Sequence, residues 1–312
     1  MSGPRPSPRA AGAPRSVPPV AVEEGFPLAR LTTVRTGGPA ELFARVGSVG
    51  ELTKLLGWAR GEQLDVAVVG SGSNLLVADG GVRGLVVKLD GELARIVRDG
   101  ACLECGAGAR LPAVAAFAAR VGLSGIEFGV NIPGTVGGAV KMNANAYGGS
   151  LGEVLEWVEL ATPAGEIVRR MPGDLGFGYR SSKLGRGEIV TGARFGLAQA
   201  EVASVKATLA QMRERRHEAQ PRGIKTFGST FKNPPQGELT AGQLLAAAGC
   251  NGLAVGGARL AEKHANFVEN TGTATTADVI AVMAQGRQRV LERFGIALEP
   301  EVQMLGDVDF PW

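Results

Sequence analysis

The sequence predicts an α+β protein with a mixed first part and a smaller α+β unit after residue 200. Short β-branched and apolar runs of strand length alternate with stretches of helical spacing through the first part. A helix expected over 201–217 ends before Gln220-Pro221, because the residue before a proline avoids the α region. A short helix over 241–248, a long helix over 276–294 and a closing strand near 301–305 make up the second part.

Local patterns support the elements of the first part. Ser48-Val49-Gly50-Glu51 has the pattern of a capping box and opens a helix that runs to about Arg60. The stretch 111–121 has helical spacing, with Leu111, Val114, Ala118 and Val121 on one face. Strands are expected over 66–69, 75–78, 84–89, 154–160, 166–169 and 189–195.

The first twenty residues differ in composition from the rest. They contain six Pro, three Arg and no acidic residue, and they lack an apolar signal core, so residues 1–22 are expected to form a disordered tail. Those three Arg account for the net charge of +3, so the basic balance gives no support for nucleic-acid binding. No apolar run approaches the roughly 20 residues of a membrane span, and no obligate protein partner is evident.

Three cysteines, Cys102, Cys105 and Cys250, are too few for a disulfide framework and fit a reducing cytoplasm. Cys102 and Cys105 form a C-x-x-C, but no second pair is present to complete a zinc site. They lie in a region that reads as two strands around Asp99-Gly100, where residues three apart point to opposite faces. We therefore expect structural cysteines and no metal site.

A first glycine-rich loop, Gly70-Ser71-Gly72-Ser73-Asn74, follows the strand expected over 66–69. A dinucleotide fingerprint would need glycine where Leu75 stands and a helix next, whereas a strand is expected here. Two interpretations remain. The loop is either a tight turn between strands, or its backbone N–H groups and its Ser71, Ser73 and Asn74 side chains hold a pyrophosphate.

A second glycine-rich segment covers residues 131–148 and is more specific. It combines Gly134, Gly137 and Gly138 with the amides Asn143 and Asn145. Small residues let backbone approach a ligand, and the amides offer donors and acceptors. Two such loops, about 60 residues apart, suit a large cofactor with a pyrophosphate and a flat ring.

The motifs 31–40, 70–77 and 132–148 resemble the FAD-binding domain of the vanillyl-alcohol-oxidase/PCMH type. In this order they resemble the UDP-N-acetylenolpyruvoylglucosamine reductase (MurB) family, over about residues 27–306. The resemblance implies an FAD-binding domain of two α+β subdomains over 30–199 and a substrate-binding domain over 200–307. It assigns contacts with non-covalent FAD to Gly70, Ser71, Gly72, Ser73, Asn74, Leu75, Ile132, Pro133, Gly134, Gly137, Gly138, Asn143, Ala146 and Tyr147.

Three further motifs resemble catalytic segments of the same family. They are Phe177-Gly178-Tyr179-Arg180-Ser181-Ser182, Gly228-Ser229-Thr230-Phe231-Lys232-Asn233-Pro234 and Glu299-Pro300-Glu301-Val302. Taken alone, they would read as a polar turn, a loop serine and a surface charge. The resemblance implies catalytic roles for Arg180, Ser229 and Glu301 and substrate contacts for Tyr179, Lys232 and Asn233.

The charge of Glu301 needs an explanation, because a carboxylate beside an anionic intermediate would repel it. We expect Glu301 to act in its protonated form or by orienting other groups. His264, in a segment that also resembles the family, is either a general base or, more commonly for an imidazole, a structural group. Tyr147 and Tyr179 are the only tyrosines, so the chain resembles the second type of the family, which lacks a tyrosine-bearing loop in the C-terminal domain.

The resemblance implies that NADPH reduces FAD and that hydride then passes to C3 of the enolpyruvyl group of a UDP-sugar. Ser229 would protonate C2, which gives UDP-N-acetylmuramate for peptidoglycan synthesis. One alternative is an oxidase of the same fold, although its members often attach FAD through His or Cys and neither occurs in the two glycine-rich loops. The other is a non-catalytic nucleotide-binding or scaffold protein.

Overall fold

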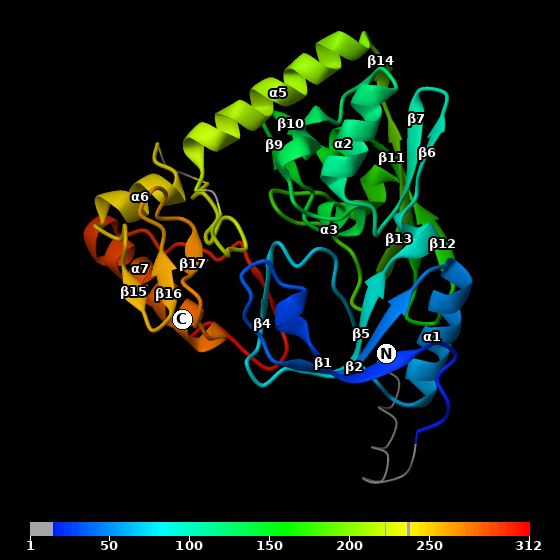
Figure 1. Ribbon diagram of the computed structural model, residues 1–312, viewed down its shortest axis with the longest axis horizontal. Helices are drawn as coiled ribbons and strands as arrows, with labels where there is room; N and C mark the ends of the chain where they lie inside the picture. The colour runs from blue at the N-terminus through cyan, green and yellow to red at the C-terminus, as the bar shows by residue number, and fades with distance from the viewer. Residues whose placement is uncertain (1–14, 222, 236–237) are drawn as a thin grey trace.

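The computed structural model describes residues 15–221, 223–235 and 238–312, and Figure 1 shows them as three lobes. The first lobe holds β1, β2, β3, β5 and α1, and the second lies above it with α2 and α3 against a sheet. The third lobe holds α6 and α7. The α+β class expected from the sequence is confirmed.

The first lobe is a four-stranded sheet in the order β1-β2-β5-β3. Its strands are β1 (Val22–Pro27), β2 (Pro39–Val46), β5 (Val82–Leu89) and β3 (Val66–Val68). Alternation along β2 sends Leu42 to one core, shared with α1 (Val49–Gly61), and Phe43 to the core on the opposite face. Helix α1 starts as expected at Ser48, whose Oγ accepts the Glu51 N–H at 3.2 Å.

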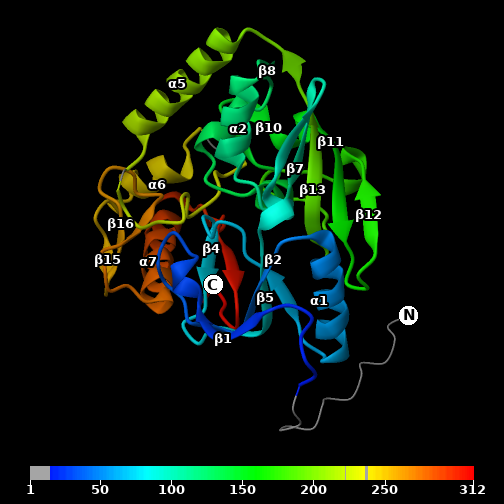
Figure 2. The ribbon, with the colours of Figure 1, turned by 45° about the vertical axis from the view of Figure 1, so that its right-hand side comes forward.

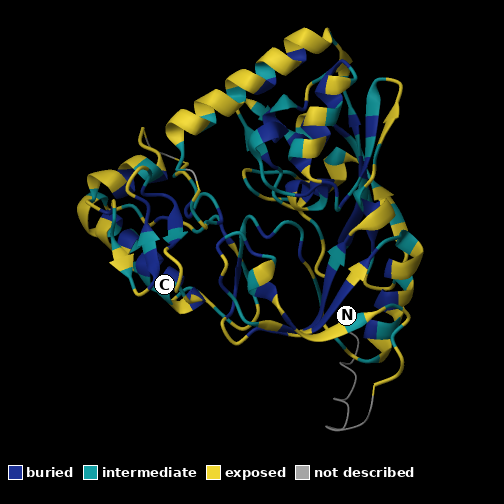
Figure 3. Ribbon diagram, in the orientation of Figure 1, coloured by how far each residue is buried: buried dark blue, intermediate teal, exposed yellow. Residues whose placement is uncertain are grey.

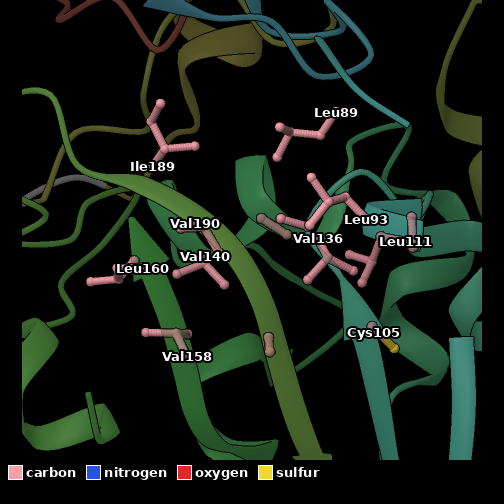
Figure 4. Packing of buried hydrophobic residues seen from close by; sticks show 14 of the residues in the cluster. Leu89, Leu93, Cys105, Leu111, Val136, Val140, Val158, Leu160, Ile189 and Val190 are labelled. Atoms are coloured by element: carbon pink, nitrogen blue, oxygen red, sulfur yellow. The ribbon is translucent and has the colours of Figure 1, made fainter. Parts of the chain in front are cut away.

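The second lobe is an antiparallel sheet in the order β12-β11-β13-β7-β6. Its strands are β12 (Ile167–Arg170), β11 (Leu155–Ala161), β13 (Ile189–Gly196), β7 (Cys102–Gly106) and β6 (Ile96–Asp99). Helices α2 (Leu111–Arg120) and α3 (Val136–Lys141) supply Leu111, Val136 and Val140 to the core that Figure 4 shows. Cys105 is buried there, and burial raises the pKa of its thiol to about 12, while Cys102 lies beside Glu156.

The third lobe packs α6 (Ala241–Ala247) and α7 (Thr276–Phe294) with a small sheet in the order β15-β16-β17. These strands are β15 (Ala254–Val255), β16 (Ala258–Leu260) and β17 (Val268–Asn270). The chain then returns to the first lobe, where β18 (Gln303–Leu305) pairs in parallel with β4 (Leu75–Val77), as Figure 2 shows.

Helix α5 (Val202–Ala219) runs from the second lobe toward the third (Figure 1). It is exposed along most of its length (Figure 3) and buries only Val205 and Leu209. A helix that is polar nearly all round suits a bridge between lobes. None of the helices in the described part of the chain is long and apolar enough to cross a membrane.

Short elements connect these parts. They are η1 (Leu28–Arg30), η2 (Gly91–Ala94), β8 (Leu123–Ser124), η3 (Glu127–Asn131), β9 (Asn145–Ala146), β10 (Gly149–Ser150), α4 (Leu151–Val154), η4 (Pro172–Leu175) and β14 (Ala198–Gln199). The expected helices and strands are present within a few residues, and the long helix over 276–294 has the predicted bounds. The closing strand begins two residues later than expected, at Gln303, which leaves Glu301 in the segment before it.

The expected tail over 1–22 is too long at its C-terminal end. Residues 1–14 lie outside the described part, but Ser16 donates its backbone N–H to Glu62 at 3.0 Å and accepts the Trp58 indole N–H at 3.0 Å. Arg15 forms an ion pair with Glu41 on β2. Residues 15–21 therefore dock on the first lobe, and β1 starts at Val22.

The N-terminus of α7 is bound to the first lobe by side-chain capping. The Asp79 carboxylate accepts the N–H groups of Thr276 and Ala277 at 2.8 and 2.9 Å. The Thr276 hydroxyl donates to the Val77 carbonyl at 2.6 Å, and Asn270 donates to Val34 at 2.9 Å. The two Asp79 bonds satisfy helix N–H groups that have no intrahelical partner, and all four bonds fix the third lobe against the first.

Asp79→Ala should remove both carboxylate bonds to α7. We expect a loss of about 1–2 kcal/mol in the free energy of unfolding, the range for losing a helix cap. Urea unfolding followed by circular dichroism measures it. Asp307→Ala is the matched control, because its side chain is 95% exposed and its ion pair with Arg83 is long, at 3.9 Å. An Asp79→Ala midpoint equal to that of the control would contradict this role.

Candidate active site

The two glycine-rich segments predicted from the sequence lie in contact. A Cβ placed on Gly70 would lie 2.5 Å from the Thr135 hydroxyl, so the Thr135 side chain packs directly against the Gly70 backbone at this point. The first segment joins β3 to β4 in the first lobe, and the second runs from η3 through α3 in the second lobe. A single extended ligand can therefore touch both.

The first loop presents a row of unused donors. Among the described residues, the backbone N–H groups of Ser71, Gly72, Ser73 and Asn74 donate to no other group, while the Gly72 carbonyl accepts the Thr33 N–H at 3.1 Å. Gly72 has φ 62 and packs so closely that a Cβ would lie 2.1 Å from the Leu31 carbonyl oxygen. Successive free N–H groups form a concave anion site, and this donor set fits the diphosphate of FAD.

Lys88 supports this loop and was missed in the sequence. Its Nζ donates to the Gly70 carbonyl at 2.7 Å. Burial, with a smaller contribution from Arg45, lowers the pKa of this amine. A lysine inside an otherwise apolar strand was the signal that could have identified it, because such a group needs a partner when buried.

Several other expected cofactor residues line the second segment. Ile132, Pro133 and Gly134 lead from η3 into α3, whose first turn holds Gly137 and Gly138, while Ala146 lies in β9 and Leu75 begins β4. Tyr147 is 39% exposed, has φ 53 and accepts the Asn131 amide N–H at 2.9 Å. Arg216 of α5 also donates to the Asn131 carbonyl, so α5 joins this edge of the site.

Arg180 stands at the corner of a closed turn. Gly178 and Ser181 exchange backbone bonds of 3.1 and 3.4 Å, and Arg180 has φ 53, a left-handed conformation that is uncommon outside glycine. Its Nε lies 2.8 Å from Glu301 Oε1 and its Nη1 donates to the Asn145 carbonyl at 3.2 Å. The Nε–H is not aligned with the carboxylate, so the contact with Glu301 is an ion pair without a well-formed hydrogen bond.

Glu301 links the turn that carries Arg180 to the segment that carries Ser229 and to the first glycine-rich loop. Its backbone N–H donates to Thr230 at 2.9 Å, and its carbonyl accepts the Asn74 amide at 3.2 Å. Its side chain is 12% exposed. Burial raises the pKa of this carboxyl, against the opposing influence of Arg180 and Lys232.

Ser229 is carried by a strand-like segment of the third lobe. Its neighbour Gly228 lies against the first loop, since a Cβ there would be 4.0 Å from the Ser73 carbonyl oxygen. Asn266, 4% exposed, holds the segment by accepting the Phe231 N–H and donating to the Phe231 carbonyl, both at 2.9 Å. The Ser229 hydroxyl itself donates to none of the described residues, which leaves its proton available.

The expected substrate residues differ in their surroundings. Tyr179 is 49% exposed beside Arg180. Lys232 lies 3.4 Å from the Glu299 carboxylate, so Glu299, which is exposed, pairs with a site residue. The Asn233 side-chain oxygen accepts the Ala241 N–H at 3.0 Å, so half of its amide already serves the start of α6.

His264 has a structural environment. Its Nδ1 accepts the Asn266 N–H at 3.3 Å and its ring packs edge-on against Phe267 at 4.9 Å. Burial lowers the pKa of the imidazole. These contacts orient Asn266 and favour the structural interpretation over a general base.

Glu301 should titrate above the ordinary glutamate value of 4.5, because its surroundings disfavour the charged form. Between pH 4.5 and its raised pKa, Glu301 holds a proton in the folded protein that it has lost in the unfolded chain. The free energy of unfolding therefore falls as pH rises through that window. Arg180→Gln removes an opposing cation and should raise the pKa further. Carbon-13 NMR of labelled glutamate measures the Glu301 pKa in the parent and in Arg180→Gln, with the resonance assigned by its loss in Glu301→Gln. A Glu301 resonance of the parent that titrates at or below 4.5 would contradict the account.

Comparisons with known proteins agree with this arrangement. A profile described as UDP-N-acetylenolpyruvoylglucosamine reductase, C-terminal domain, matches residues 220–305, and one described as FAD binding domain matches residues 40–170. The protein named UDP-N-acetylenolpyruvoylglucosamine reductase 2 of Symbiobacterium thermophilum is 44% identical over 292 residues, 93% of this chain and 94% of its own. The protein of Gloeobacter violaceus named UDP-N-acetylenolpyruvoylglucosamine reductase is 42% identical, over 91% and 96% of the two chains.

A solved structure gives the same result. The crystal structure of UDP-N-acetylenolpyruvylglucosamine reductase (MurB) from Thermus caldophilus matches with a TM-score of 0.79 and 37% identity. The match covers 92% of this chain and 98% of that one. This chain belongs to the UDP-N-acetylenolpyruvoylglucosamine reductase family, with an FAD-binding domain followed by the C-terminal domain of that family.

Proposed function

We propose that this protein uses FAD and NADPH to reduce UDP-N-acetylglucosamine enolpyruvate to UDP-N-acetylmuramate, a precursor of peptidoglycan. The observation that carries the proposal is the convergence of Arg180, Glu301 and the Ser229 segment beside the row of free N–H groups at 71–74. The names of relatives that match more than nine-tenths of the chain support it. The domains proposed are an FAD-binding domain over 30–199 and a substrate-binding domain over 200–307.

When bound, FAD supplies the redox chemistry by accepting hydride from NADPH and delivering it to C3 of the enolpyruvyl group. The residues that would hold it are the N–H groups of 71–74 and the backbone of 132–138. Neither segment contains His or Cys, so we propose a non-covalent cofactor. The UDP-sugar and NADPH are the partners proposed, in the cytoplasm.

Arg180 binds the substrate carboxylate and stabilises the negative charge that spreads onto it after hydride addition. A guanidinium is planar and permanently charged, with five N–H donors. Nε faces Glu301 and Nη1 donates to Asn145, which leaves the donors of Nη2 for the substrate. Such a charge placed before the reaction lowers the barrier because it needs no reorganisation.

Glu301 has two roles: it orients the Arg180 guanidinium, and in its protonated form it limits the negative charge near the substrate. Its raised pKa increases the fraction of neutral carboxyl, which does not repel an anionic intermediate as a carboxylate would. Its contact with Nε also fixes the direction of the guanidinium. Lys232, steadied by Glu299, adds positive charge for an anionic substrate.

Ser229 donates the proton to C2. A serine hydroxyl is a weak acid, but the carbon that hydride addition leaves is a strong base within its reach. The donor is not engaged elsewhere in the described residues, and Asn266 keeps its segment fixed.

The direct test of this function is NADPH oxidation by the purified holoprotein with and without UDP-N-acetylglucosamine enolpyruvate. We expect oxidation in proportion to the substrate consumed, with UDP-N-acetylmuramate as the product. NADPH oxidation that the substrate does not stimulate would refute the proposal, and oxidation of an alcohol or sugar with oxygen would support an oxidase.

Ser229→Ala should separate the two halves of the reaction. It should bind FAD normally and allow NADPH to reduce the flavin at the parent rate, since the serine acts after hydride transfer. Reoxidation by the enolpyruvyl substrate should slow by about 10²–10⁴-fold, the contribution of general acid catalysis. Stopped-flow flavin absorbance measures both steps.

Ser204→Ala, on the exposed face of α5, is the matched control and should behave as the parent in both steps. Ser229→Cys retains an acidic hydrogen and should recover part of the rate. Parent-like reoxidation in Ser229→Ala would show that another group donates the proton.

A further inference from the structure

Both ends of the Asn143 side-chain amide make hydrogen bonds within the protein, which leaves one N–H and one lone pair for other partners. Its Nδ2 donates to the Gly178 carbonyl at 3.2 Å, and its Oδ1 accepts the Gly152 N–H at 3.1 Å. Gly178 opens the turn that carries Arg180, and Gly152 lies in the first turn of α4. The amide therefore ties the arginine turn to the helix that follows the second glycine-rich segment.

A second route leads from Asn143 to the guanidinium. The Asn143 carbonyl accepts the Asn145 side-chain amide at 3.4 Å. The Asn145 carbonyl in turn accepts Arg180 Nη1 at 3.2 Å. Asn143 is thus connected to both the backbone and the charged end of Arg180.

The backbone at both ends of this connection is strained. Asn143 has φ 39 and Arg180 has φ 53, so both lie in the left-handed region. Asparagine tolerates that region because its short amide can bond locally, whereas the left-handed conformation is unfavourable for arginine. A strained turn keeps its shape only where neighbouring groups hold it. The Asn143 amide is such a group, because it donates to the carbonyl of Gly178, the first residue of the Arg180 turn.

We propose that Asn143 is a positioning residue for Arg180, and that its amide, through Gly178, sets the guanidinium in the place from which it meets the substrate carboxylate. This rests on the proposed role of Arg180. It differs from the contact with FAD that the family resemblance implied for Asn143, which a fall in bound FAD in Asn143 variants would indicate instead. A misplacement of about 1 Å in such a group lowers turnover by up to about 10²-fold.

Asn143→Asp isolates the bond that matters. Aspartate tolerates the left-handed backbone and still accepts the Gly152 N–H, but it has no N–H for the Gly178 carbonyl. Asn143→Gly removes the side chain without adding charge and also suits φ 39. If both variants lose turnover, the new charge of the aspartate is not the cause.

The holoproteins are compared for bound FAD, thermal midpoint, flavin reduction by NADPH, and kcat and KM for the enolpyruvyl substrate. We expect kcat to fall about 10–100-fold in both variants, with parent-like FAD content and flavin reduction. Asn251→Asp is the matched control, because it removes the same kind of bond, a 2.7 Å donation to the Glu262 carbonyl, in the third lobe.

A double-mutant cycle decides whether the effect passes through Arg180. In an Arg180→Lys background, Asn143→Asp should cost less than about threefold in kcat, because residues that act as a unit are not additive. An undiminished loss in that background, a fall in bound FAD, or parent-like kcat in both Asn143 variants would overturn the inference. Parent-like kcat in Arg180→Lys alone would instead overturn the proposed role of Arg180.

Discussion

The ion pair between Arg180 and Glu301 is the contact on which the site depends. Its 2.8 Å separation joins a turn of the second lobe to the segment that leads back from the third lobe to the first. Glu301 reaches this place because β18 pairs with β4 directly after it, and because its backbone bonds Thr230 and Asn74. Burial raises the pKa of the Glu301 carboxyl, and the neighbouring Arg180 guanidinium opposes that shift.

Two asparagine side chains give this contact its rigidity. Asn266 pairs with both backbone groups of Phe231 and holds the Ser229 segment, while Asn143 bonds Gly178 and holds the Arg180 turn. An amide is suited to this task because it donates and accepts at once without adding charge. The segments that carry Ser229 and Arg180 are therefore held by neutral side chains that add no charge to the site.

Local patterns predicted the elements, and motif resemblance predicted the site. The Thr275 cap and the apolar face of α7 lie within one helix, so its bounds could be read directly, and the loops 70–74 and 131–148 were recognised from glycine and amide content. The docking of residues 15–21, the pairing of β1 with β2 and the Lys88 contact depend on residues far apart in the chain. The engagement of Asn143 within the protein depends likewise on a contact 35 residues away, which spacing does not reveal.

The central claim is that Arg180 and Glu301 act as one unit across the lobes. A double-mutant cycle on flavin reoxidation by the enolpyruvyl substrate, with Arg180→Gln, Glu301→Gln and the double variant, tests it most directly. Coupled residues should make the double variant about as slow as the slower single variant. Losses that multiply, so that the double variant is slower by the product of the two single effects, would contradict the account.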